Sequence, residues 1–94
     1  MIQFEWDENK NRSNRKKHGV WFEEAQQVFN DLAALRYFDS KHSEYEDRFI
    51  LLGMSGINRT LVVVYCEQEA PNIIRIISAR KATKIEVKAY EKGI

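Results

Sequence analysis

The sequence predicts a single α+β domain in which an antiparallel, meandering sheet is flanked by helices. The chain has 94 residues, which is enough for one hydrophobic core and too few for two. Its 44% hydrophobic and 31% charged residues are ordinary proportions for a globular protein. Helical patterns near both ends enclose several strand-like runs with hairpin-length connections, and such connections join antiparallel neighbours.

The N-terminal part of the chain predicts a short strand and then a polar helix. Residues Ile2–Trp6 alternate between apolar and polar side chains, as a strand with one buried face does. Asp7 is a favourable N-cap for a helix over Glu8–His18, and Gly19 is a favourable residue to end it. Because this helix is polar on all sides, no apolar stripe can hold it. We therefore expect it to make few contacts and to present a basic side.

A second helix is predicted over Phe22–Asn30, followed by a group of strands. The apolar residues of this helix recur at helical spacing and form a buried stripe: Phe22, Ala25, Val28 and Phe29. Three strands are predicted over Asp47–Ser55, Thr60–Glu67 and Asn72–Arg80, and Arg36–Asp39 is a candidate for a fourth before them. The run Thr60–Glu67 is nearly all apolar and rich in β-branched residues, which is typical of a central strand. Residues 55–59 fit a hairpin connection, and residues 70–72 fit a turn.

The last predicted element is a helix that begins after Thr83. The sequence Thr83-Lys84-Ile85-Glu86 fits a capping box, in which each end residue accepts a hydrogen bond from the other's backbone N–H. Ile85 and Ala89 lie at helical spacing and are expected to face the sheet. We expect the helices to cover one face of the sheet and the other face to stay partly open.

Charge is segregated along a chain whose net charge is only +1. The segment Lys10–Lys17 holds five basic residues and no acid, and Arg75–Lys92 holds six basic residues against two acids. Between them, Phe22–Asp47 holds seven acids against two basic residues. If the fold brings the two basic segments together, they form a cationic face that suits a phosphate-bearing partner. On charge alone, the alternative of separate solvated surfaces is favoured.

Several classes of protein are excluded by what the sequence lacks. It has no glycine-rich dinucleotide or phosphate-binding motif and no metal-ligand spacing, so neither a cofactor nor a metal ion is expected. A single cysteine, Cys66, excludes an internal disulfide, and its apolar neighbours predict a buried thiol rather than a nucleophile. No apolar run is long enough to cross a membrane, and the N-terminus does not resemble a signal peptide. We expect a cytoplasmic protein with no membrane partner.

Lys17 and His18 are the first candidates for chemistry. Histidine readily both gives and takes a proton near neutral pH, and lysine is a common phosphate contact. The alternative is a structural helix end, because cations there favour the helix dipole and Gly19 supplies the left-handed conformation. Spacing alone favours the structural interpretation, and the two are compatible because a capped helix end is a rigid mount for an imidazole.

Arg48, Arg75 and Arg80 lie in or beside apolar strands, where a guanidinium needs a partner or an open face. On an open face they would form a cationic floor for phosphate. The alternative is a set of salt bridges to the acidic middle segment. Arg75 and Arg80 are five positions apart, so a regular strand points them to opposite faces. They can converge only if the strand bends or ends near Ser78 and Ala79, and three arginines on one sheet favour an anion site.

Two aromatic residues, Trp21 and Tyr90, could stack on nucleic-acid bases. More often such side chains belong to the core, and Trp6 is the strongest core candidate among them. His42 stands in a polar turn and is expected to be exposed.

Taken together, these segments resemble the BrnT family of bacterial toxins. The front half of the resemblance comprises Phe4-Glu5-Trp6-Asp7, Asn14, Lys17-His18-Gly19-Val20 and Phe22-Glu23-Glu24-Ala25. The back half comprises Arg48, Gly53, the block from Ile74 to Thr83, Glu86 and Tyr90. Each motif is weak alone, but they occur in the family's order over nearly the whole chain.

The resemblance implies a toxin of a type II toxin–antitoxin pair, with residues 1–94 as a single BrnT-like domain. Such toxins are ribonucleases that cleave RNA and arrest growth, with a fold similar to that of the RelE toxins. The implied partner is a BrnA-type antitoxin with a ribbon-helix-helix portion. Operator DNA is then bound only through the toxin–antitoxin complex.

Trp21 departs from the family pattern, which has a small hydroxyl residue before Phe-Glu-Glu-Ala. A serine there would cap the second helix, whereas tryptophan cannot, at a cost of about 0.5–2 kcal/mol unless something compensates. The start of the second helix is therefore in question, and an indole is expected beside Lys17 and His18.

These residues give a hypothesis for metal-independent RNA cleavage. The catalytic candidates are Arg48, Arg75 and Arg80 around the scissile phosphate and His18 as proton carrier; the RNA-binding candidates are Lys17, Trp21 and Tyr90. The alternative is a non-catalytic module, or degenerate toxin, that binds RNA or the antitoxin without chemistry.

Overall fold

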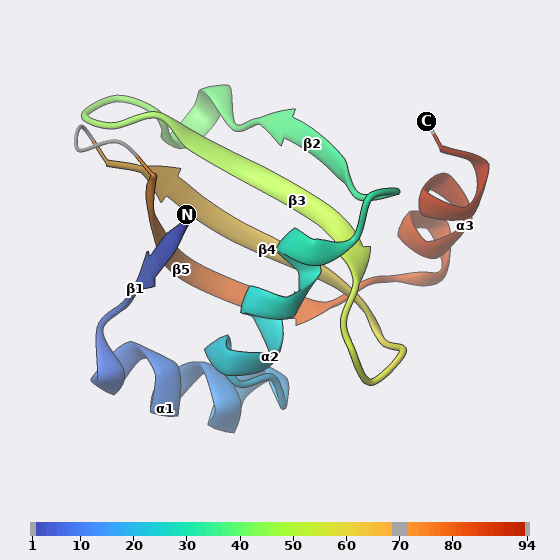
Figure 1. Cartoon of the computed structure of the whole chain (residues 1–94), viewed down its shortest axis with the longest axis horizontal. Helices are drawn as coiled ribbons and strands as arrows, with labels where there is room; N and C mark the ends of the chain where they lie inside the picture. Colours follow the sequence, from blue (N-terminus) through green and yellow to red (C-terminus); the bar gives the residue numbers. More distant parts are fainter. Residues whose placement is uncertain (1, 69–71, 94) are drawn as a thin grey trace.

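A computed structural model describes residues 2–68 and 72–93 and shows a five-stranded sheet with helices on both sides (Figure 1). The elements are β1 (Gln3–Glu5), α1 (Glu8–His18), α2 (Phe22–Gln27), the 3₁₀ turn η1 (Val28–Asn30), β2 (Leu35–Phe38), the 3₁₀ turn η2 (Ser40–His42), β3 (Arg48–Met54), β4 (Thr60–Glu67), β5 (Ile73–Lys81) and α3 (Lys84–Lys92). The strand order is β1-β5-β4-β3-β2. Strands β2 to β5 form the expected antiparallel meander, and β1 joins its edge parallel to β5. The predicted α+β class is confirmed, and the predicted turn lies mostly outside the described residues.

The hydrophobic core lies between the α1–α2 layer and one face of the sheet. The helical layer contributes Val20, Phe22, Ala25 and Val28, and the sheet contributes Leu51, Leu61, Val63, Tyr65, Ile74, Ile76 and Ala79. The second predicted helix is divided, because its α-helical part ends at Gln27 and continues as η1. Trp6 packs against this core as expected, with its ring at 75° to that of Phe22 and 6.0 Å away.

Two buried asparagines hold α1 in the absence of an apolar stripe. The Nδ2 of Asn14 donates to the carbonyl oxygens of Val20, at 2.8 Å, and Ala79, at 2.9 Å. Its Oδ1 accepts from the backbone N–H of Ala79 at 3.2 Å. Asn11 is 1% exposed and donates to both Glu8 and Glu23 at 2.8 Å. The polar helix therefore makes specific buried contacts rather than few contacts.

A residue of α1 replaces the capping hydrogen bond that α2 lacks at its start. Trp21 stands at the N-cap and its side chain makes no capping hydrogen bond. Instead, the Oδ1 of Asn11 in α1 accepts a hydrogen bond from the backbone N–H of Phe22 at 2.8 Å. One of the free N–H groups at the helix start is thus satisfied from outside, so α2 begins at Phe22 despite the missing serine.

Helix α3 differs most from expectation, because it borders the other face of the sheet. Thr83 and Glu86 form the predicted capping box, but no residue of α3, all of which are described, is buried. Ile85 and Ala89 border the sheet as expected, but Ile85 is 81% exposed. The helix is attached mainly by polar contacts, including a 2.7 Å hydrogen bond from the Tyr90 hydroxyl to Asp31. Hydrogen bonds of this kind fix the position of α3, although none of its residues is buried.

Candidate active site

A β-bulge in β5 brings Arg75 and Arg80 to the same face of the sheet. Arg75 pairs with Cys66 and Arg80 with Val62, but Ile77 is an extra residue between the pairs Tyr65–Ile76 and Val64–Ser78. Residues opposite each other in an antiparallel pair point to the same face, so the extra residue restores a common direction. Arg48 also pairs with Cys66. All three arginines therefore lie on the face turned away from the core, which we call the open face.

The three arginines do not meet at one point. Arg48 and Arg75 flank Cys66, whereas Arg80 lies beside Val62, four residues away along β4. At about 3.3 Å per residue this separation is about 13 Å. The open face therefore offers two cationic positions along β5, with Ser78 between them.

Arg48 and Arg75 have loose acidic neighbours. The Nη2 of Arg48 is 3.8 Å from a carboxylate oxygen of Glu46, and the Nη1 of Arg75 is 3.7 Å from one of Glu5. Both distances are too long for a hydrogen bond, so these guanidinium groups keep donors for a phosphate. The buried Nε of Arg48 has no hydrogen-bond partner within the described ranges.

Cys66, between these two arginines, is fully buried. Burial and the nearby Glu46 carboxylate raise the pKa of its thiol. The thiolate is the nucleophilic form of cysteine, so the raised pKa agrees with the predicted inert role.

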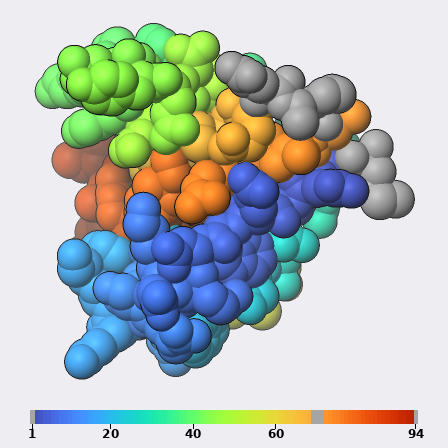
Figure 2. Space-filling model, turned by 90° about the vertical axis from the view of Figure 1, so that its left-hand side faces the viewer, coloured from blue at the N-terminus to red at the C-terminus, as the bar shows by residue number. Residues whose placement is uncertain are grey.

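The C-terminal half of α1 forms a basic pocket against the bulge of β5. It is lined by Lys10, Ser13, Asn14, Lys17, His18, Ile77 and Ser78. Each of the helical residues lies three or four positions from another one of them, so they share one side of α1. Figure 2 shows β5, in orange, exposed between α1, in blue, and the green segment around residue 45. The structure therefore places Lys17 and His18 next to Ser78, between the positions of Arg75 and Arg80 along the strand.

Arg80 is the most tightly held of the three arginines. Its Nη1 and Nη2 donate to the two carboxylate oxygens of Glu86 at 2.7 and 2.8 Å. The same carboxylate accepts from the backbone N–H of Thr83 at 2.8 Å. This arrangement lowers the pKa of Glu86 to about 2, with the hydrogen bonds from Arg80 as the largest cause. Salt bridging to the acidic middle segment was the alternative for these arginines. Among the described residues it applies to Arg48 beside Glu46, whereas Arg75 lies near Glu5 and Arg80 binds Glu86.

Replacing Glu86 by glutamine tests this ion pair through stability. A folded-state pKa of about 2 against an ordinary 4.5 stabilises the fold above pH 4.5, and the gain is lost as the pH falls towards 2. The shift corresponds to about 3 kcal/mol before solvent screening. Since 43% of the Arg80 side chain is exposed, we expect Glu86→Gln to lower the free energy of unfolding at pH 7 by about 1–2 kcal/mol.

Urea denaturation between pH 7 and pH 2.5 measures this difference. The curves of wild type and Glu86→Gln should converge at acid pH. Glu91→Gln removes an exposed carboxylate from the same helix and is the matched control. A constant gap between wild type and Glu86→Gln across this range would contradict the assignment.

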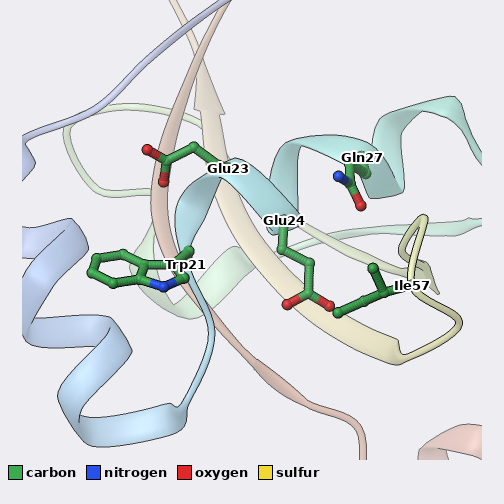
Figure 3. A pocket seen from close by; sticks show the side chains of 5 residues that line it. All are labelled: Trp21, Glu23, Glu24, Gln27 and Ile57. Atoms are coloured by element: carbon green, nitrogen blue, oxygen red, sulfur yellow. The ribbon is translucent and has the colours of Figure 1, made fainter.

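The structure places Trp21 and Tyr90 away from the basic pocket. Trp21 is 43% exposed, lies 5.7 Å from the guanidinium of Arg15, and lines a separate groove (Figure 3). The other residues of that groove are Glu23, Glu24, Gln27 and Ile57. Tyr90 points to Asp31 and attaches α3. The cation over the indole ring is that of Arg15, and Trp21 does not line the basic pocket that holds Lys17 and His18.

Sequence reasoning missed three residues of this region: Lys10, Ser78 and Glu86. Lys10 stands seven and eight residues before Lys17 and His18, so helical spacing could have added it. The position of Ser78 in the pocket could not be predicted without knowing that β5 contains a bulge. Glu86 was recognised only as a capping residue, because nothing in the sequence shows that Arg80 reaches it.

Residues 2–68 and 72–93 hold no group of three or more histidine, cysteine, aspartate or glutamate side chains placed to bind a metal ion. This part of the chain also contains no helix with the length and apolar character that a membrane crossing needs.

Comparisons with known proteins agree with this fold. Residues 6–86 match the family model described as the ribonuclease toxin BrnT of type II toxin–antitoxin systems. The crystal structure of the Brucella abortus ribonuclease toxin BrnT is similar, with a TM-score of 0.69 and 25% sequence identity. The match covers 89% of this chain and 100% of that one. No curated protein sequence matches the chain. Because the family model spans most of its length, this chain belongs to the BrnT family of ribonuclease toxins of type II toxin–antitoxin systems.

Proposed function

We propose that this chain is a metal-independent endoribonuclease that cleaves RNA on the open face of the sheet, beside the basic pocket of α1. The observation that carries the proposal is the bulge at Ile77, which puts Arg75 and Arg80 on the same face. Lys17 and His18 border that face at Ser78. Cationic side chains and a proton carrier are thus arranged around a path that an RNA backbone can follow along β5.

Cleavage of this kind requires three actions. The ribose 2′-hydroxyl must lose a proton as it attacks the phosphorus, the phosphate must be stabilised as its charge grows, and the leaving 5′-oxygen must gain a proton. Guanidinium groups suit the second action, because they remain charged and donate in pairs to phosphate oxygens. Arg48 and Arg75 are assigned to it first, since their acidic neighbours lie beyond hydrogen-bond distance.

His18 is assigned the proton transfer, and Lys17 a contact with an adjacent phosphate. Both side chains are exposed at the end of α1, whose position is fixed by Asn14 beneath the pocket. Arg80 lies at the far end of the face, where Glu86 orients its guanidinium. Any base contacts by Trp21 and Tyr90 lie outside the basic pocket, since neither residue lines it.

A type II toxin has an antitoxin partner, and we propose that it is a BrnA-type protein with a ribbon-helix-helix portion. Operator DNA is then contacted through the complex rather than by this chain alone. The proposed substrate and site of action are RNA in the cytoplasm, and the proposed unit is one toxin domain over residues 1–94.

Induced expression of the chain alone in a bacterial host tests the proposal. The expected result is growth arrest with RNA breakdown, both absent in a His18→Ala/Arg80→Ala double variant and both relieved by the cognate antitoxin. Normal growth with intact RNA, from soluble and folded wild-type protein, contradicts the ribonuclease.

The competing proposal is a non-catalytic module that binds RNA or the antitoxin. One observation favours it: both terminal nitrogens of Arg80 are already bound to Glu86, which reduces their availability to a phosphate. Under this alternative, purified protein retards RNA in a gel without shortening it.

A further inference from the structure

A groove runs between α3 and the open face of the sheet. Its floor is formed by Ile50, Leu52 and Val62, and its walls by Tyr37, Arg80, Ile85, Glu86 and Ala89. Most of this lining is aliphatic, and Ile85 on the rim is 81% exposed. An exposed isoleucine above an apolar floor is unfavourable in water and is typical of a surface that receives a partner.

Helix α3, which supplies one wall of this groove, carries lysines next to the lining residues Ile85 and Ala89. Lys84, Lys88 and Lys92 follow one another at intervals of four, so they form a stripe along one side of α3. All three are exposed, as is Lys81 at the end of β5. The carboxylate of Glu86 is already paired with Arg80, which leaves Glu91 as the other acid of the helix. The apolar groove and the neighbouring lysines therefore complement a segment with apolar residues on one side and acidic residues beside them.

We propose that the groove between α3 and the open face is the docking site for an acidic amphipathic segment of the antitoxin. This inference rests on the proposed function, because it takes neutralisation of RNA cleavage as the purpose of docking. Apolar side chains of the segment fill the groove above Leu52 and Val62. Its carboxylates contact the lysine stripe of α3.

Occupation of the groove covers part of the open face, on which RNA cleavage is proposed. Arg80 lies in the groove wall and also on the open face, so a bound segment covers one of the two cationic positions along β5. RNA is a poorer occupant than a peptide, because the groove floor is aliphatic and both terminal nitrogens of Arg80 in the wall are already bound to Glu86. Helix α3 has no buried residue, so it can shift to fit the segment without exposing a core.

Two variants of exposed residues test the docking site against a matched control. Ile85→Glu and Lys88→Glu place a negative charge on the groove rim and should leave the fold unchanged, because both side chains are exposed. Ile57→Glu makes the same change at another isoleucine, 63% exposed, in the separate groove beside Trp21. The probe is the purified cognate antitoxin. Its dissociation constant is measured by calorimetry, and RNA cleavage by each free variant is measured alongside.

The expected result is a dissociation constant raised about 10–100-fold by Ile85→Glu and at least 10-fold by Lys88→Glu, and left unchanged by Ile57→Glu. Free Ile85→Glu should cleave RNA at the wild-type rate and escape inhibition by the antitoxin. Amide hydrogen exchange in the wild-type complex should slow across α3.

Other results overturn the proposal and show which part has failed. If Ile57→Glu alone weakens the antitoxin, the docking site is the groove beside Trp21. If Ile85→Glu impairs RNA cleavage while the antitoxin still binds, the groove receives RNA. If the free chain self-associates and Ile85→Glu abolishes this without affecting the antitoxin, the occupant is a second copy. If wild type cleaves no RNA but Ile85→Glu still weakens the antitoxin, the ribonuclease proposal fails and the docking site stands.

Discussion

A His18→Ala variant is expected to cleave RNA about 10²–10⁴ times more slowly than wild type, with unchanged stability. The imidazole stands at the exposed end of α1, in the pocket that reaches Ser78. Its removal takes away the assigned proton carrier and leaves the arginines in place. The single-turnover rate on a short RNA substrate measures the loss, and the binding of that RNA should weaken much less than the rate.

The chain contains its own control for this experiment. His42 is the other histidine, and its Nδ1 lies 3.0 Å from a carboxylate oxygen of Asp39 in η2. It lines no part of the basic pocket. His42→Ala should therefore cleave RNA at the wild-type rate. Equal effects of the two substitutions, or none from either, would remove His18 from the mechanism.

An Asn14→Ala variant is expected to lower the free energy of unfolding by about 3 kcal/mol. The substitution removes three hydrogen bonds to backbone groups of Val20 and Ala79. Those groups stay buried, and each unsatisfied group costs about 1–3 kcal/mol. For a domain whose total stability is about 5–15 kcal/mol, such a loss is large.

Chemical denaturation at neutral pH measures this loss. Asn9→Ala changes an exposed asparagine of the same helix and should cost less than about 0.5 kcal/mol. Asn14→Asp keeps an acceptor for the Ala79 N–H but loses both donated bonds, so it should also be strongly destabilised. A loss below about 1 kcal/mol for Asn14→Ala would show that water replaces the side chain.

The element order could be predicted from the sequence because it depends on local signals. Alternation, capping residues and helical spacing located α1, the meander and the start of α3 to within a residue or two. The parallel pairing of β1 with β5 has no local signal, since the two strands are about 70 residues apart. The position of α3 could not be predicted either. Ile85 and Ala89 have the spacing of a buried stripe, but this spacing does not show whether the helix packs tightly.

The candidate site could be predicted only in part, and β5 shows why. The residues Arg75 and Arg80 were identified from their unusual place in an apolar strand. Their placement on one face of the sheet depends on the bulge at Ile77, which no residue type in that run signals. The expected bend near Ser78 and Ala79 was one residue away from it.

The pairing of the first strand with the last also determines when the basic pocket between α1 and β5 can form during folding. The bond from Asn14 to Ala79 joins residues 65 positions apart, and β1 has no partner strand until β5 is available. Contacts this distant in sequence form late, after the loop-closure cost has been met. The hairpin of β3 and β4 can form much earlier. A chain still being synthesised therefore carries Lys17 and His18 without the strand that completes their pocket. The proposed RNA-binding surface is therefore completed as one of the last steps of folding, when most of the sequence has already been made.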